Sequence, residues 1–96
     1  MTTLPHYIKD PDAVLDYGFD WSDWLAVGET ISASEWSITL APDAILVIDS
    51  ESETTTETLV WLSGGTEGQL YGLTNHITTS AGREDDRSLR VRIRER

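Results

Sequence analysis

The amino-acid sequence predicts an all-β protein, an antiparallel sandwich of about seven strands in a single domain. Apolar and polar residues alternate with period two in several segments, and no segment keeps the i, i+3, i+4, i+7 spacing of an amphipathic helix over three turns. Thr, Ser, Val, Ile and Trp are abundant between Gly, Pro and Asp residues that favour turns. The segments follow one another at spacings of about 8–12 residues, which is typical of a β-sandwich.

The N-terminal part contains an expected arm and the first expected strand. Residues 1–8 are expected to form a flexible arm before a domain that spans residues 9–96, because two of the three prolines lie among the first twelve residues. The first strand is expected where Leu15, Tyr17, Phe19 and Trp21 alternate with Asp16, Gly18 and Asp20. This alternation indicates one aromatic face and one acidic face. Trp24, Leu25 and Val27 are expected to cover one end of the core.

The middle of the chain predicts a bulged strand and a short apolar strand. In residues 29–40, Ile31 and Ala33 share one parity, whereas Trp36, Ile38 and Leu40 share the other. Since a one-residue slip moves every side chain to the opposite face, a β-bulge is predicted near Ser34 and Glu35. Residues 44–48 are apolar at both parities and predict a strand that is covered on both faces or lies centrally in its sheet. Residues 49–56 are polar and are expected to form a surface connection.

Residues 58–62, 69–80 and 89–93 complete the predicted strands. Three glycines between Ser63 and Gly68 indicate a turn. Residues 81–86 are expected to form a polar loop in which Glu84, Asp85 and Asp86 pair with Arg83 and Arg87. The solvent-exposed face of residues 69–80 is expected to carry Thr74, His76, Thr78 and Ser80. The predicted core comprises Leu15, Tyr17, Phe19, Trp21, Trp36, Ile38, Val60, Leu62, Tyr71, Leu73, Leu89, Val91 and Ile93.

Composition excludes several classes of function. The net charge of −10 argues against nucleic-acid binding, because neutralising phosphates requires clustered Lys and Arg. The longest apolar run, Ala44 to Ile48, is far shorter than the roughly 20 residues that span a bilayer, and a secretion signal is not recognisable, so no membrane contact is expected. With no cysteine, the chain has no disulfide and no thiolate zinc site, which fits folding in a cytoplasm.

No motif indicates catalysis, a metal or a cofactor. The acidic series Asp10, Asp12, Asp16, Asp20 and Asp23 lacks the spacing of a calcium-binding loop. His6 and His76 are the only histidines, and neither has the sequence context of a serine-hydrolase nucleophile. The chain is therefore expected to be a non-enzyme with no catalytic residue, no metal ligand and no cofactor.

Two sets of side chains are candidates for binding another protein. Arg90, Arg92 and Arg94 alternate with core residues, so they are expected to project from one face about 7 Å apart, next to a loop that carries Arg83 and Arg87. Of the four tryptophans, Trp21 and Trp36 continue apolar strand faces, whereas Trp24 and Trp61 are candidates for an interface. An exposed Trp24 or Trp61 is also consistent with a carbohydrate- or peptide-binding module.

An ordered series of strings resembles the phage fiber–tail adaptor proteins. The strings are Lys9 to Tyr17, Phe19 to Leu25, Gly28 to Ile31 with Trp36, Leu62 to Thr66, Tyr71, Leu73 to Asn75, Ile77 to Arg83 and Asp86 to Ser88. The resemblance covers roughly Lys9 to Glu95. It implies an immunoglobulin-like fold and a structural component of a tailed-phage or prophage virion, made in the bacterial cytoplasm.

The resemblance also implies which partners to expect. They are other phage structural proteins of the tail, the fiber or the head–tail connector, joined by protein–protein contacts without catalysis. A head–tail joining role suits the same sequence, and oligomerisation in the particle stays open. The alternative from another class is the carbohydrate- or peptide-binding β-sandwich module.

Overall fold

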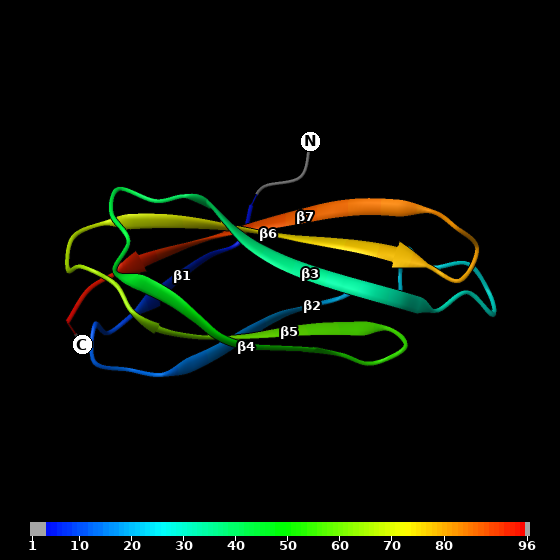
Figure 1. Cartoon of the computed structure of the whole chain (residues 1–96), viewed down its shortest axis with the longest axis horizontal. Coiled ribbons are helices and arrows are strands. Elements are labelled where there is room, and N and C mark those ends of the chain that lie inside the picture. Colours follow the sequence, from blue (N-terminus) through cyan, green and yellow to red (C-terminus); the bar gives the residue numbers. More distant parts are fainter. Residues whose placement is uncertain (1–3, 96) are drawn as a thin grey trace.

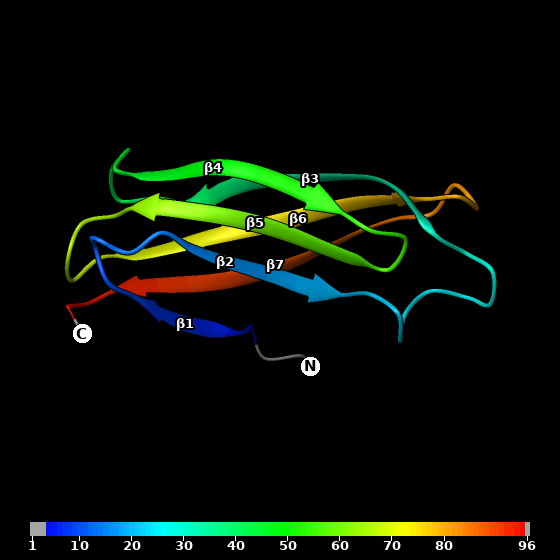
Figure 2. The same ribbon diagram turned by 90° about the horizontal axis from the view of Figure 1, so that it is seen from below.

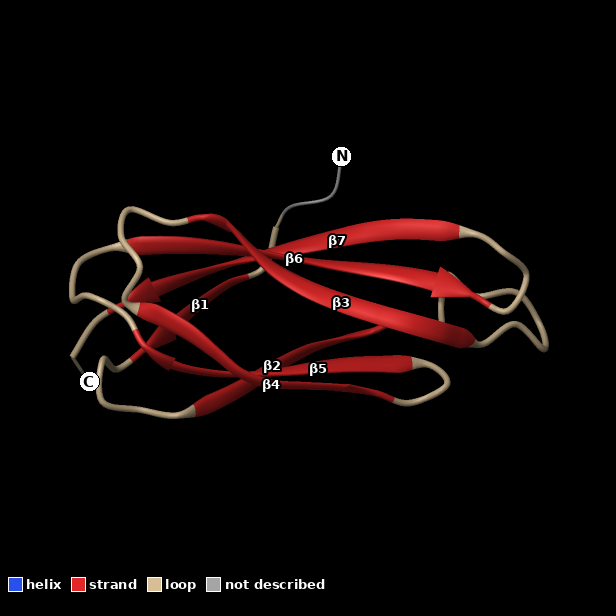
Figure 3. Cartoon of the chain, viewed as in Figure 1, coloured by secondary structure: helices blue, strands red, loops and turns tan. Residues whose placement is uncertain are grey.

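A computed structural model describes residues 4–95, which form seven strands and no helix. The strands are β1 His6–Lys9, β2 Leu15–Asp20, β3 Ile31–Leu40, β4 Leu46–Glu53, β5 Glu57–Gly64, β6 Leu70–Thr79 and β7 Glu84–Ile93. A four-stranded sheet of order β1-β7-β6-β3 packs against a three-stranded sheet of order β2-β5-β4 (Figures 1 and 2). Long loops gather at the two ends of the sandwich (Figure 3). The predicted all-β sandwich is confirmed.

The core lies between the two sheets because alternate residues of the central strands point inward. Val60 and Leu62 of β5 face the four-stranded sheet and are fully buried. Burying a side chain of this size contributes about 1.5–3 kcal/mol. Tyr71, Leu73, Leu89, Val91 and Ile93 are fully buried on the opposing strands, and Tyr17, Phe19 and Ile38 are partly buried against them.

Asn75 connects the two sheets through the otherwise apolar interior. Its Oδ1 accepts hydrogen bonds from Trp21 Nε1 at 3.0 Å and from Thr58 Oγ1 at 2.7 Å. Its Nδ2 donates to Ser34 Oγ at 2.9 Å and to the Glu35 carbonyl at 3.1 Å. Because buried amides require such partners, this fully bonded side chain fixes how β6 faces the strands around it.

Three expectations about apolar residues differ from the structure. Leu15 was expected in the core, but it lies at the start of an edge strand and is 36% exposed. Val27 was expected to cover the core, but it is fully exposed, and only Trp24 and Leu25 of that loop pack on Trp21. The stretch 44–48 was expected to be covered or central, but β4 is an edge strand, and Ile45 and Val47 are 53% and 47% exposed. The core additionally contains Ile31, Leu46 and Ile77.

Three segments expected outside the sheets are strands. Residues 6–8 of the expected arm belong to β1, which pairs in parallel with β7, whereas residues 1–3 lie outside the described residues. Residues 49–53 extend β4. Residues 50–53 pair with β5, and Asp49 lies at the register shift between Ile48 and Ser50. Residues 84–86 begin β7, where Glu84 and Asp86 stand opposite Thr78 and His76.

The predicted bulge near Ser34 and Glu35 was wrong. These two residues pair regularly with Ile77 and His76. The register of β3 shifts instead between Ile31 and Ala33 and again between Ile38 and Leu40. The first shift explains why side chains of opposite parity, Ile31 and Trp36, are both buried.

Candidate protein-interaction site

Arg83 is held at one end of the sandwich by the loop between β2 and β3. Its Nε donates to Glu29 Oε2 at 2.9 Å, and its Nη2 forms a close ion pair with Glu29 Oε1. Nη2 also donates to the Trp24 carbonyl at 3.3 Å, and the guanidinium carbon lies 4.0 Å from the centre of the Trp24 ring. Arg83 and Trp24 are therefore partners of each other inside this chain.

Glu29 is the acid that organises this end of the molecule. Its side chain is nearly buried, accepts from Thr79 Oγ1 at 2.6 Å and accepts from the Ala26 amide at 2.9 Å. The hydrogen bonds from Arg83, then from Thr79 and Ala26, lower the pKa of Glu29 to about 2. The sequence offered no local signal for this role, because Arg83 and Thr79 lie more than 45 residues away along the chain.

Arg87 covers Trp21 from outside. Its guanidinium carbon lies 4.1 Å from the centre of the Trp21 ring, and its Nη1 donates to the Asp20 carbonyl at 3.0 Å. Trp21 itself is fully buried. Arg87 thereby ties the start of β7 to the end of β2, and its charge is directed at an aromatic face instead of at solvent.

Arg90, Arg92 and Arg94 lie along the outer face of the four-stranded sheet and at its end. Within residues 4–95 none of the three forms an ion pair with a carboxylate. Arg90 lies flat across β6, since a Cβ placed on Gly72 would lie 2.5 Å from Arg90 Nη1. Glycine at position 72 therefore makes room for this guanidinium. Arg90 and Arg92 are half-buried and Arg94 is exposed.

Trp61 lies on the opposite side of the sandwich, on the outer face of the three-stranded sheet. It stands in the central strand β5 between Asp16 of β2 and Ser50 of β4. Its exposed fraction is 39%, whereas the neighbouring Val60 and Leu62 point inward and are fully buried. The structure thus separates Trp61 from the arginines and from Trp24.

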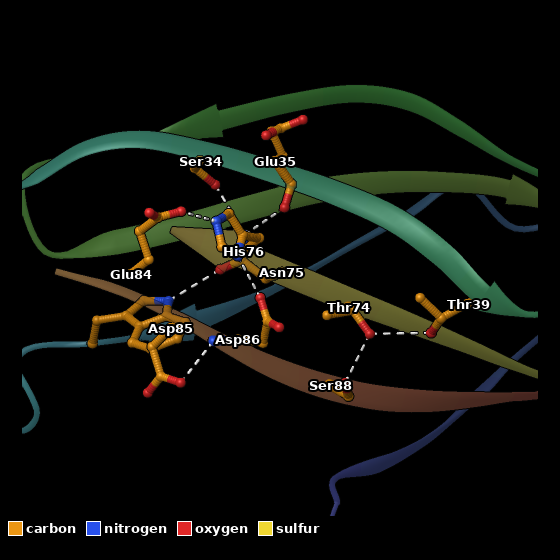
Figure 4. A network of polar contacts seen from close by, with 11 residues as sticks. Ser34, Glu35, Thr39, Thr74, Asn75, His76, Glu84, Asp85, Asp86 and Ser88 are labelled. Carbon is orange, nitrogen blue, oxygen red and sulfur yellow. Dashed lines mark hydrogen bonds and ion pairs between the residues drawn. The ribbon is translucent and has the colours of Figure 1, made fainter. Parts of the chain in front are cut away.

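His76 lies on the outer face of the four-stranded sheet between two carboxylates (Figure 4). Its Nδ1 is 2.6 Å from Asp86 Oδ1, and its Nε2 is 2.8 Å from Glu84 Oε1. These hydrogen bonds, to Asp86 first and then to Glu84, raise the pKa of His76. The predicted pairing of the acids at 84–86 with Arg83 and Arg87 was wrong, because the histidine takes that place. Both ring nitrogens contact carboxylates, so neither activates a serine hydroxyl.

The only lysine is buried, although lysine is rarely found in protein interiors. Lys9 Nζ donates to the Gly64 carbonyl at 2.8 Å and to the Asp10 carbonyl at 2.9 Å. Burial lowers the pKa of Lys9. The ammonium group joins the end of β1 to the end of β5 and is not available to a partner.

A groove of about 580 Å³ lies beside the first half of β7, where β1 no longer covers that strand. It is lined by Leu4, Pro5, Phe19, Asp85, Asp86, Arg87 and Ser88. Within residues 4–95, no three His, Asp or Glu side chains are placed to hold a metal ion. Nor do residues 4–95 form a helix long and apolar enough to cross a membrane.

Comparisons with known proteins agree with this architecture. The solution structure of the PKD domain from KIAA 1837 protein has a TM-score of 0.55 and 16% identity, over 98% of this chain and 82% of that chain. At this identity the likeness shows the fold alone, an immunoglobulin-like sandwich. No match was found among curated proteins. The family model described as podophage GP4 fiber-tail adaptor protein gp77 matches residues 9–92. Because the match spans most of the length of this chain, the chain belongs to the podophage fiber-tail adaptor family.

Proposed function

We propose that this chain is a non-catalytic adaptor that joins tail or head–tail components of a bacteriophage or prophage virion by protein–protein contacts. Family membership supports a structural phage protein of the virion tail. The absence of cysteine is consistent with synthesis and folding in the host cytoplasm. The partners are other phage structural proteins.

The observation that carries the proposal is the unpaired row of Arg90, Arg92 and Arg94. Arg90 and Arg92 lie on one face of β7 about 7 Å apart, and Arg94 follows the end of the strand. Their like charges repel one another, and none of the three forms an ion pair with a carboxylate within residues 4–95. Exposed Ile8 and Leu40 lie on the strands at either edge of the same sheet and add apolar surface. Arginine beside apolar side chains is typical of protein interfaces. An acidic partner surface would therefore gain both charge pairing and apolar contact here.

The test replaces Arg90, Arg92 and Arg94 together by Gln and measures incorporation of the chain into assembled particles. We expect a folded protein with strongly reduced incorporation, because the charge is removed while the strand remains. A triple Lys variant is the matched control. It keeps the charge but not the planar, two-pronged geometry of arginine, so incorporation between wild type and the Gln variant is expected. Normal incorporation of a folded Gln variant would disprove this interface.

A second function is favoured by one specific observation, the exposed ring of Trp61. A carbohydrate- or peptide-binding module needs an aromatic platform beside polar groups, and Trp61 stands beside Asp16 and Ser50. Trp24 does not support this alternative, because Arg83 covers its ring. Titrating the protein with neutral oligosaccharides while following the Trp61 indole resonance distinguishes the two functions.

A further inference from the structure

The three-stranded sheet differs in charge from the rest of the molecule. Its three strands contain no Lys, Arg or His. They carry six carboxylates: Asp16, Asp20, Asp49, Glu51, Glu53 and Glu57. None of these six forms an ion pair within the described part of the chain. Two cations contact the sheet: Arg87 donates to the Asp20 carbonyl at one end, and the buried Lys9 donates to the Gly64 carbonyl at the other. Neither lies over the middle of the sheet.

The middle of the outer face is apolar and exposed. Trp61 stands at its centre. Ser63 lies two residues further along β5 on the same face, and the residue opposite it on β4, Val47, is 47% exposed. Directly opposite residues of an antiparallel pair have Cβ atoms about 4.5–5.5 Å apart, so the Asp16 and Trp61 side chains leave the sheet next to each other on the same face. Asp49 is held on the same face, where it accepts from Ser63 Oγ at 3.0 Å.

Trp61 lacks the cover that this chain gives to two of its other tryptophans. The Trp21 and Trp24 rings each have a guanidinium group about 4 Å above them, from Arg87 and Arg83. Among the described residues no cation lies over Trp61. An aromatic face with a carboxylate beside it attracts a cation by two additive effects, the ring quadrupole and the charge.

We propose that the outer face of the β2-β5-β4 sheet docks a basic surface of another virion protein, with a Lys or Arg side chain over Trp61 and paired with Asp16. The inference rests on the proposed adaptor function and assigns the adaptor a second binding surface. This face lies on the opposite side of the sandwich from Arg90 and Arg92, so the two faces can bind two different proteins at once. Arg90 and Arg92 lie on one outer face, whereas Asp16, Asp20 and Glu57 share the outer face of Trp61, so a basic partner surface is favoured beside Trp61 and disfavoured beside the arginines.

Charge complementarity selects a basic protein over the other occupants of a tryptophan platform. A neutral sugar stacks on the ring and can donate hydroxyl hydrogen bonds to Asp16, but it brings no positive charge to a face that carries uncompensated carboxylates. A nucleic acid is repelled by a face without cations. A second copy of this chain also offers arginines. If its arginine face bound the Trp61 face of the first copy, the contact would be head-to-tail, and copies would stack into an open array instead of a closed oligomer.

The first experiment uses the full chain and a defined probe, the peptide acetyl-Gly-Arg-Gly-Arg-Gly-amide, in about 0.15 M NaCl, where long-range attraction is largely screened. The ¹⁵N–¹H resonances of the tryptophan indoles report on each ring, and the Trp61 signal is assigned by its loss in Trp61→Phe. We expect the Trp61 resonance to shift saturably. The same peptide with Gln in place of Arg is expected to leave it unmoved.

Four variants make the result specific. Trp61→Thr, with a residue that suits a strand, is expected to weaken binding about tenfold, and Trp61→Phe less. If Trp61→Thr does not fold, Trp61→Phe still tests the ring. Asp16→Asn is expected to weaken binding about threefold, as for an exposed ion pair. Asp23→Asn is the matched control, because it removes the same charge from an exposed loop residue. It is expected to bind like wild type.

Several outcomes overturn the inference. Equal weakening by Asp16→Asn and Asp23→Asn would mean attraction to net charge only. Equal binding of the Gln peptide or of a neutral oligosaccharide would mean an aromatic platform without cation selectivity. Self-association that depends on Trp61, measured by sedimentation, would make a second copy the occupant. Failure here is distinguishable from failure of the adaptor function, which is read from particle incorporation of the Arg90, Arg92 and Arg94 variants.

Discussion

Arg83 and Glu29 illustrate how single residues of this chain use charge inside the fold. Arg83 binds both carboxylate oxygens of Glu29, and its planar guanidinium also stacks on Trp24. A lysine cannot form this paired geometry. The ion pair therefore closes the loop of residues 21–29 over the smaller hydrophobic cluster, which contains Trp21, Ile31 and Ile77.

Replacing Glu29 by Gln should change how stability depends on pH. The pKa of Glu29 is lowered from 4.5 to about 2 on folding, so its contribution is fully present above pH 4.5 and is lost as the pH falls through 2. We expect Glu29→Gln to have a lower melting temperature than wild type at pH 7. The difference should shrink between pH 4.5 and 2. Thermal melts across that range test this, with the exposed Glu53→Gln as control. A constant difference would contradict the assignment.

Replacing Asn75 by Leu should be strongly destabilising although Leu has a similar volume. The change leaves the buried Trp21 Nε1 and the Thr58 hydroxyl without their acceptor, at about 1–3 kcal/mol for each group. We expect a loss of about 2–5 kcal/mol by urea denaturation. Ser34→Ala removes only one acceptor of the Asn75 amide and is expected to lose about 1 kcal/mol. Equal losses in the two variants would argue against the central role of Asn75.

At the scale of elements, β7 is the strand on which the most depends. It pairs with β6 on one side and with β1 on the other, and it supplies Leu89, Val91 and Ile93 to the core. Its other parity carries Arg90 and Arg92. The fold and the proposed contact surface therefore share one strand and use its two faces.

Substitution by Asp should have opposite effects on stability at two adjacent positions of β7, because one side chain points into the core and the other points outward. Val91→Asp places an unpaired carboxylate in the core, which costs several kcal/mol against a typical total of about 5–15, so the domain should unfold. Arg92→Asp changes an outward side chain and should alter stability by only about 0.5 kcal/mol. Circular dichroism and thermal melts measure both. A folded Val91→Asp variant would mean that the strand is oriented the other way.

Local pattern explains which elements could be predicted from the sequence. Strand β7 from residue 89 and strand β5 were predictable because their alternation is regular and is bounded by glycines or polar residues. Strand β1 was not, because its four residues are held by parallel pairing with β7 more than 80 positions away and by the buried Lys9 ammonium. The extension of β7 to Glu84 depends on His76 bridging two carboxylates, and no single segment encodes that contact.

The same distinction applies to the candidate sites. The outward direction of Arg90 and Arg92 follows from period two, and it could be predicted. The engagement of Arg83 with Glu29, and of Arg87 with Trp21, depends on loops that meet only in the folded molecule. The exposure of Trp61 follows from its parity with the buried Val60 and Leu62. Its lack of a covering arginine could be known only once both sheets were placed.

At the scale of the whole molecule, charge is unevenly distributed over the sandwich. The net charge is −10. Two of the three ion pairs of residues 4–95 share His76, and the third is Arg83 with Glu29. On the three-stranded sheet, Asp20 and Glu57 stand directly opposite each other. Like charges in that position are destabilising, so repulsion outweighs pairing over this sheet.

Salt should therefore stabilise the protein. Raising NaCl from about 0.02 to 0.3 M shortens the screening length to below 10 Å and weakens the repulsion between carboxylates more than it weakens the few close ion pairs. If screening recovers about 1 kcal/mol, the melting temperature should rise by about 4–8 °C for a domain of this size. Chloride is used in place of sulfate, because sulfate strengthens apolar burial by itself. Glu57→Gln removes the exposed member of the facing pair and should raise the melting temperature at low salt while reducing the gain on adding salt. A melting temperature that falls with NaCl would show that attractive pairs, and not the acidic three-stranded sheet, control the electrostatic stability of the molecule.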